Sequence, residues 1–152
     1  RPTVIVVYKW DEADARGLKQ KKVTEDVRDH LKFLPWAKIV YTSAKTGKGL
    51  TAILLAAEKA AAAGGQRMTT GQLNRFLAEA SQRFPPKAMK GNQPVKILFG
   101  TQIGISPPTY ALSLNHPVDL HFSYRRYLEN QLRETLDLEG TPVVIKVRTR
   151  KH

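Results

Sequence analysis

Two short motifs in the first third of the chain contain residue types that recognise a purine base. Tyr8-Lys9-Trp10-Asp11 directly follows the β-branched run 4–7, and Ser43-Ala44-Lys45 follows a second strand-like run at 37–41. The first run is typical of a strand buried on both faces of a parallel sheet. Because both motifs stand at strand ends, we expect them to contribute to one site.

The chemistry that suits these motifs is recognition of guanine. The carboxylate of Asp11 can accept two hydrogen bonds from the N1 and N2 edge of guanine, which adenine cannot offer. The amide of Ala44 can donate to guanine O6, and the lysine stems can lie along the purine ring. The predicted nucleotide-binding residues are Lys9, Asp11, Ser43, Ala44 and Lys45.

The two motifs resemble the Asn-Lys-x-Asp and Ser-Ala-Lys elements of P-loop GTPases. Tyr8 departs from that pattern, because an asparagine at this position ties the base-binding loop to the phosphate loop and a tyrosine cannot do so with the same geometry. The phosphate-binding pattern G-x-x-x-x-G-K-[ST] does not occur, and Thr46-Gly47-Lys48-Gly49 has the wrong spacing for it. We therefore expect a turn and a helix start at 46–49, and no bound nucleotide in this chain alone.

Composition restricts the class of partner. The 152 residues include 25 lysines and arginines against 13 acidic residues, which gives a net charge of +12 and favours a polyanion such as nucleic acid. An anionic membrane surface is the alternative, but no apolar run approaches the ~20 residues of a spanning helix. The chain contains no cysteine. Its four histidines lack ligand spacing, so we expect neither a metal site nor acid–base catalysis.

Hydrophobic periodicity over residues 1–66 predicts the order strand, helix, strand, helix, which implies a βαβ unit. The first helix is expected over 21–34, where Pro35 closes it. The buried face of the second helix is predicted to contain Leu50, Ile53, Leu54 and Ala57. Gly64-Gly65 suits a left-handed helix cap and a flexible joint, so we place a domain boundary between residues 66 and 67.

Residues 67–152 predict the order helix, strand, strand, helix, strand. Thr69 and Gln72 form a capping-box pattern, and strands are expected at 95–102 and 109–115. Ser123 is expected to cap a helix in which Tyr124 and Tyr127 belong to the core. The last strand, 142–150, is predicted to place Val143, Ile145 and Val147 on one face and basic residues on the other.

Basic residues of this second half predict a surface that binds RNA phosphates. The basic strand alone is equally typical of a solvated edge strand that resists sheet-to-sheet pairing. Both halves of the chain are basic, and no G-x-x-G loop is present in the second half to clamp nucleic acid. The predicted RNA-binding residues are Lys87, Lys90, Arg125, Arg126, Lys146, Arg148, Arg150 and Lys151.

Several stretches resemble the C-terminal part of the EngA family, also called Der. These proteins are tandem GTPases that assist assembly of the large ribosomal subunit, and their two GTPase domains precede a KH-like domain without a G-x-x-G loop. The most specific stretch is Phe122–Asn130, which reads Phe-Ser-Tyr-Arg-Arg-Tyr-Leu-Glu-Asn. The others are Met68-Thr69-Thr70, Leu73–Leu77, Lys96–Phe99, Thr101-Gln102, Ser106–Thr109, Arg133 and Gly140-Thr141-Pro142.

The resemblance implies an α/β fold in which residues 1–66 are the C-terminal half of a P-loop GTPase-type domain and residues 67–152 are a KH-like α+β domain. It also implies an assembly GTPase that uses GTP or GDP with Mg²⁺ when complete. This chain, which starts without methionine, is expected to be the portion that docks on large-subunit ribosomal RNA and contacts ribosomal proteins and the GTPase domains. Hydrolysis by this chain alone is not expected.

Two other functions stay open at this point. One is a pseudo-GTPase scaffold that binds without nucleotide, and the other is a free-standing RNA-binding module. The expected location is the cytoplasm, in association with ribosomes, and the alternative is a mitochondrial or plastid matrix.

Overall fold

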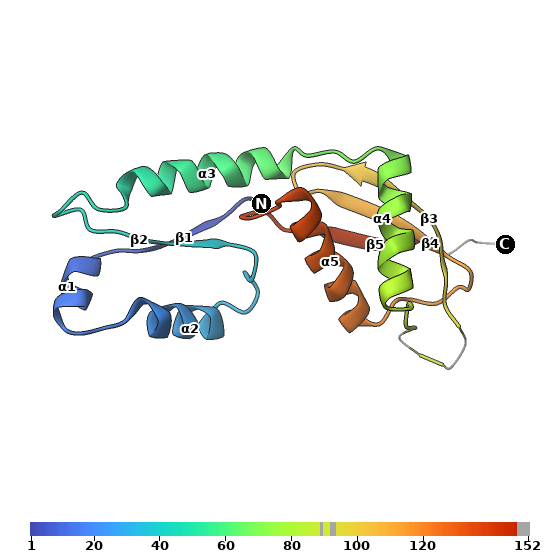
Figure 1. Cartoon of the computed structure of the whole chain (residues 1–152), viewed down its shortest axis with the longest axis horizontal. Helices are drawn as coiled ribbons and strands as arrows, with labels where there is room; N and C mark the ends of the chain where they lie inside the picture. Colours follow the sequence, from blue (N-terminus) through green and yellow to red (C-terminus); the bar gives the residue numbers. More distant parts are fainter. Residues whose placement is uncertain (89, 92–93, 149–152) are drawn as a thin grey trace.

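The computed structural model describes residues 1–88, 90–91 and 94–148, which form two α/β units in succession (Figure 1). Arg150 and Lys151 of the predicted RNA-binding set lie outside the described residues. The first unit contains β1 (Val4–Val7), α1 (Trp10–Ala15), α2 (Gln20–His30), β2 (Lys38–Tyr41) and α3 (Leu50–Gly64). The second contains α4 (Thr70–Arg83), β3 (Ile97–Gly104), β4 (Thr109–Leu114), α5 (Phe122–Leu136) and β5 (Val144–Arg148).

The first unit is built on a parallel pair of strands, with β1 beside β2 in the register Val4 to Lys38 through Val7 to Tyr41. The predicted βαβ arrangement is confirmed. Helix α3 runs along one side of the strands and α2 along the other (Figure 1). The strand β1 is less buried than its composition predicts, since the side chain of Val6 is 40% exposed.

Helix α2 is shorter than predicted, because it ends at His30 rather than at residue 34. A turn follows, in which the Leu34 amide donates to the Leu31 carbonyl. The guanidinium of Arg28 holds this turn by donating to the carbonyls of Leu34 at 3.0 Å and Ala37 at 2.7 Å. The short helix α1 was not predicted from the sequence.

The buried face of α3 differs from the prediction. Leu54 and Leu55 are 66% and 61% exposed, whereas Ala60, Ala63 and Gly64 are buried. The small side chains let the helix approach the second unit closely, which leucine would prevent. The predicted left-handed cap at the end of this helix is also wrong, because Gly65 has φ −88°.

The second unit has a sheet with the order β3-β4-β5, in which β3 and β4 are antiparallel and β4 and β5 are parallel. Helices α4 and α5 pack on one face of this sheet. The core between these helices and the sheet is apolar and contains, among others, Leu73, Leu77, Tyr110, Leu112, Leu128, Leu132 and Ile145. The strand β5 alternates as predicted, with Val143 and Ile145 buried and Lys146 and Arg148 exposed.

The predicted N-terminal cap is correct for α4 and incorrect for α5. The capping box of α4 is confirmed, since the Gln72 amide donates to Thr69 Oγ1 at 3.2 Å and the Gln72 side chain accepts from the Thr69 amide at 3.0 Å. Helix α5 begins one residue before Ser123, and its cap is His121, whose Nδ1 accepts from the Ser123 amide at 3.2 Å. Tyr124 belongs to the core as predicted, because its side chain is only 5% exposed.

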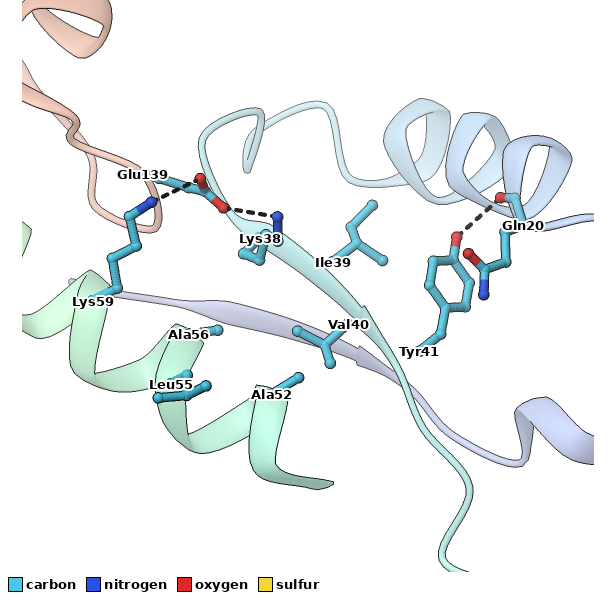
Figure 2. A pocket seen from close by; sticks show the side chains of 10 residues that line it. All are labelled: Gln20, Lys38, Ile39, Val40, Tyr41, Ala52, Leu55, Ala56, Lys59 and Glu139. Carbon is cyan, nitrogen blue, oxygen red and sulfur yellow. Dashed lines mark hydrogen bonds and ion pairs between the residues drawn. The ribbon is translucent and has the colours of Figure 1, made fainter. Parts of the chain in front are cut away.

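The two units are joined at the segment between α5 and β5. The Gly140 amide donates to the Trp36 carbonyl at 2.9 Å, and the Gly140 carbonyl accepts from the Thr3 amide at 2.8 Å. Beside it, Glu139 forms ion pairs with Lys38 and Lys59 across a cavity of about 460 Å³ (Figure 2). Because these ion pairs are exposed, they contribute little, and the backbone bonds carry the joint.

We predict that Gly140→Ala destabilises the chain through this joint. Gly140 has φ +84°, and an added Cβ would collide with the Cβ of Ala60 in α3. The matched control is Gly17→Ala, because Gly17 has φ +78° and open space around it. Backbone strain predicts a loss of about 1 kcal/mol for the control and about 2 kcal/mol more for Gly140→Ala, measured by urea unfolding. Equal losses in the two variants would show that the packing between the units is loose.

Candidate guanine pocket and nucleic-acid interface

The two predicted base-recognition motifs lie side by side after the ends of β1 and β2. The amide of Trp10 donates to the Thr42 carbonyl at 2.9 Å, and the amide of Thr42 donates to the Val7 carbonyl at 2.8 Å. These bonds extend the parallel pairing past both strands and fix one motif against the other. Parallel strands end at the same edge of a sheet, so the sequence motifs meet for a topological reason.

The side chains of Asp11 and Ser43 interact within this arrangement. Ser43 is 2% exposed, and its Oγ accepts from the Thr46 amide at 3.3 Å. A hydrogen bond from the Ser43 side chain, helped by the nearby charge of Lys45, lowers the pKa of the Asp11 carboxyl. Asp11 is ionised at neutral pH, as a carboxyl with an ordinary pKa already is, so its oxygens can accept the hydrogen bonds that the predicted recognition of guanine needs.

The remaining predicted nucleotide-binding residues are accessible to a ligand. Lys9, Ala44 and Lys45 are exposed, and Lys9 adopts a left-handed backbone conformation with φ +54° directly before α1. Trp10 is a residue whose role the sequence did not reveal. It is 5% exposed and packs edge-on against Tyr41 with ring centroids 4.8 Å apart, so it anchors the motif to β2.

The predicted RNA-binding residues that are described lie in three places. Lys146 and Arg148 are exposed on β5. Lys87 and Lys90 are exposed in the connection between α4 and β3, where the Lys87 carbonyl accepts from the His121 amide at 2.8 Å. Arg125 and Arg126, on α5, are the third place. The structure therefore does not bring all the predicted RNA-binding residues into one cluster.

Neighbouring arginines on α5 have different surroundings. The guanidinium of Arg125 donates to the Ile145 carbonyl and forms an ion pair with Asp119, so it ties α5 to β5. Arg126 is exposed on the side of α5 that faces the first unit. Arg125 thus has a structural task that the sequence did not reveal, while its contact with RNA stays a prediction.

Arg126 lines a cavity of about 500 Å³ at the junction of the two units. Its lining is basic and includes Arg28, Lys32, Trp36, Arg126, Glu129, Asn130 and Arg133. Arg133 donates to the carbonyls of Leu138 at 3.1 Å and Thr141 at 2.6 Å, and burial lowers the pKa of its guanidinium. Burial likewise raises the pKa of the Glu129 carboxyl. The sequence did not predict this cavity, because its basic residues lie on elements about a hundred residues apart.

Membrane-spanning helices and metal sites are two further kinds of feature that the described residues could contain. No described helix is long and apolar enough to cross a membrane. Among the described residues, no group of three or more histidine, aspartate and glutamate side chains has the arrangement of a metal site.

Together these observations define the class of protein. The second unit is a KH-like domain of α-β-β-α-β order with both helices on one sheet face, and it lacks the G-x-x-G loop. The unit before it places the two predicted base-recognition motifs at the ends of parallel strands. A family profile described as "KH-domain-like of EngA bacterial GTPase enzymes, C-terminal" matches residues 67–148. The chain belongs to the EngA family.

Relatives with the name GTPase Der support this assignment over nearly the whole chain. The protein of Caldanaerobacter subterraneus subsp. tengcongensis is 42% identical over 147 residues, which cover 97% of this chain and 33% of that protein. The protein of Nitratiruptor sp. is 44% identical over 147 residues, covering 97% of this chain and 31% of that protein. The protein of Brevibacillus brevis is 38% identical over 148 residues, which cover 97% of this chain and 34% of that protein. The chain therefore spans about a third of the length of these relatives.

We predict that the Asp11 carboxyl titrates below its ordinary pKa of 3.8. The folded state favours the ionised form, so this carboxylate stabilises the fold above pH 4, and the contribution is lost as the pH falls through the folded pKa. The titration can be followed by the ¹³C shift of the carboxyl carbon in NMR spectra.

Two substitutions separate the causes of this shift. Ser43→Ala is expected to raise the pKa of Asp11 more than Lys45→Ala, because the hydrogen bond from Ser43 is the larger cause. If Ser43→Ala leaves the titration unchanged, Ser43 does not position the Asp11 carboxylate.

Proposed function

We propose that this chain is part of a GTPase that assists assembly of the large ribosomal subunit, and that it docks on large-subunit ribosomal RNA through its KH-like domain. The observation that carries this proposal is the family membership of a strongly basic KH-like domain. The net charge of the whole chain, +12, suits a polyanionic partner. The exposed pair Lys146 and Arg148 on an otherwise apolar strand offers it a defined contact.

In the complete protein the cofactor is GTP or GDP with Mg²⁺, which supplies the nucleotide-dependent states that control docking. The residues of the first unit suit the base of that nucleotide, since Asp11 offers an ionised carboxylate beside Ser43 and Ala44 is exposed. Asp11 orients guanine, and Ala44 donates to its O6 atom. The phosphates and Mg²⁺ are held outside this chain, which lacks the phosphate-binding pattern.

The partners that follow from this proposal are large-subunit ribosomal RNA, ribosomal proteins and the GTPase domains. The location that follows is the cytoplasm, on maturing ribosomes, with an organellar matrix as the alternative. Tyr8 favours a second candidate function, a scaffold that has lost its coupling to nucleotide, because asparagine normally stands there in GTPases. Tyr8 is 73% exposed, so its side chain does not support the base-binding loop.

Nucleotide dependence separates the two candidates. In the full-length protein, the affinity for large-subunit RNA should differ between the GTP-bound and GDP-bound states and should be measured by filter binding under both conditions. Equal affinities in the two states, together with an absence of GTP turnover, would favour the scaffold function and exclude the function of an assembly GTPase.

We predict that the double variant Lys146→Glu, Arg148→Glu weakens binding to large-subunit RNA by tenfold or more. It should also reduce the slope of log Kd against log salt by about two, since two phosphate contacts and their released counterions are lost. The measurement is a salt titration of RNA affinity by fluorescence anisotropy.

A variant with the same change in net charge provides the control. Lys21→Glu, Lys22→Glu reverses two exposed lysines on α2, far from β5. Its effect on the affinity should be smaller than that of the β5 variant. Equal effects in the two variants would mean that binding depends on net charge alone and would contradict docking through β5.

A further inference from the structure

The sheet of the KH-like domain has one face that no described helix covers. Helices α4 and α5 both pack on the opposite face, where Tyr110, Leu112 and Ile145 form the core (Figure 1). On the open face, β3 exposes large apolar side chains: Leu98 is 60% exposed, Phe99 47% and Ile103 42%. Large apolar side chains that are exposed next to one another on a sheet face are typical of a contact surface.

The strand register places basic side chains in line with the exposed aromatic ring. Phe99 pairs with Ser113, and Ser113 pairs with Arg148, so these three residues form one row across the sheet. The next row contains Thr101, Ala111 and Lys146. Because side chains alternate between faces along a strand, both rows lie on the open face.

Two local features give this face its shape. A register shift between Ile97 and Phe99 marks a β-bulge, which explains why the consecutive residues Leu98 and Phe99 are both exposed. The central strand β4 contributes only the small side chains of Ala111 and Ser113 to these rows, so nothing large stands between Phe99 and the cations of β5. With strands about 4.8 Å apart, the backbones of Phe99 and Arg148 are about 10 Å apart.

We propose that this open face, called here the sheet platform and comprising Phe99, Ile103, Lys146 and Arg148, binds unpaired RNA. A base stacks on Phe99, and the phosphates beside it contact Lys146 and Arg148. This inference rests on the proposed function and adds to it the class of RNA and the aromatic residue that selects it.

The charges on the sheet platform favour RNA over a protein as its ligand. Neither Lys146 nor Arg148 forms an ion pair with a carboxylate among the described residues. The described strand residues of this face include no acidic side chain. An apolar row flanked on one side by unpaired cations matches a nucleotide, which presents an aromatic base and an anionic phosphate a few ångströms apart.

The platform distinguishes single-stranded RNA from a duplex. The bases of a duplex are stacked on one another and cannot reach an aromatic side chain on a sheet, whereas the bases of loops and bulges can. Lys146 and Arg148 contact phosphates in either case. Stacking on Phe99 therefore provides a preference for unpaired RNA that the cations alone cannot provide.

The test compares a 12-nucleotide single-stranded RNA with an RNA duplex of the same length, using the whole chain. Phe99→Ala and Phe99→Leu should weaken binding of the single strand about fivefold or more, because stacking on the ring is lost while the cations remain. Binding of the duplex and the salt slope should not change. Phe99→Trp should retain single-strand binding, and its fluorescence should be quenched by the RNA.

Controls guard against misfolding and against a general aromatic effect. Phe33→Ala removes a 71% exposed ring from the first unit and should leave both affinities unchanged. Phe99→Leu keeps the apolar volume at this position, so it tests stacking even if Phe99→Ala does not fold.

The outcomes separate the platform from the proposed docking. If Phe99→Leu binds the single strand as the unchanged chain does, while reversal of Lys146 and Arg148 weakens binding, docking through β5 stands and the platform is wrong. The apolar row would then be a contact for a protein. If neither change affects RNA binding, both the platform and the docking surface are overturned.

Discussion

The close approach of Gly140 to α3 is the constraint on which the rest of the structure depends. Gly140 forms backbone hydrogen bonds with the residues that precede both strands of the first unit, Thr3 before β1 and Trp36 before β2. A residue with a side chain does not fit there, because Ala60 occupies the space. The alanine-rich composition of α3 follows from this contact, since larger side chains on that face would push the two units apart.

As a consequence of this contact, the predicted base-recognition motifs and the KH-like domain lie at opposite ends of α3. Helix α3 begins just after the loop that contains Ser43 and ends at Gly64, whose carbonyl accepts from the Ser106 amide of the KH-like domain at 2.7 Å. Its 15 residues span about 22 Å. A structural change near Ser43 can therefore reach the KH-like domain through a rigid helix and a short hydrogen-bonded joint, which is the route that the proposed nucleotide control of docking would use.

Sequence patterns predicted the features that depend on neighbouring residues. The order of elements apart from α1, the capping box at Thr69 and the alternation along β5 follow from local spacing, and the structure confirms them. The meeting of the two guanine motifs was predictable too, because parallel strands end at one edge. The motif resemblance likewise identified the family before any contact was known.

Features that depend on distant residues were not predictable in the same way. The buried face of α3 is set by Gly140, 80 residues after Ala60, so helical periodicity alone favoured the wrong leucines. Nothing in the sequence indicated a structural role for Arg125, yet its guanidinium donates to the Ile145 carbonyl and so connects α5 to β5. The cap of α5 is His121 and not Ser123. The sequence pattern favoured Ser123 because histidine is an uncommon cap residue. The basic cavity at the junction needs residues from both units.

Native-state hydrogen exchange of the joint tests the central claim most directly, namely that the two units move as one body. The Gly140, Thr3 and Ser106 amides all donate across the joint. If the claim is correct, these amides exchange only by global unfolding, with the same free energy as the core amides of β4. Exchange of these three amides at a free energy lower by about 2 kcal/mol, while β4 stays protected, would show that the units separate and would contradict the account.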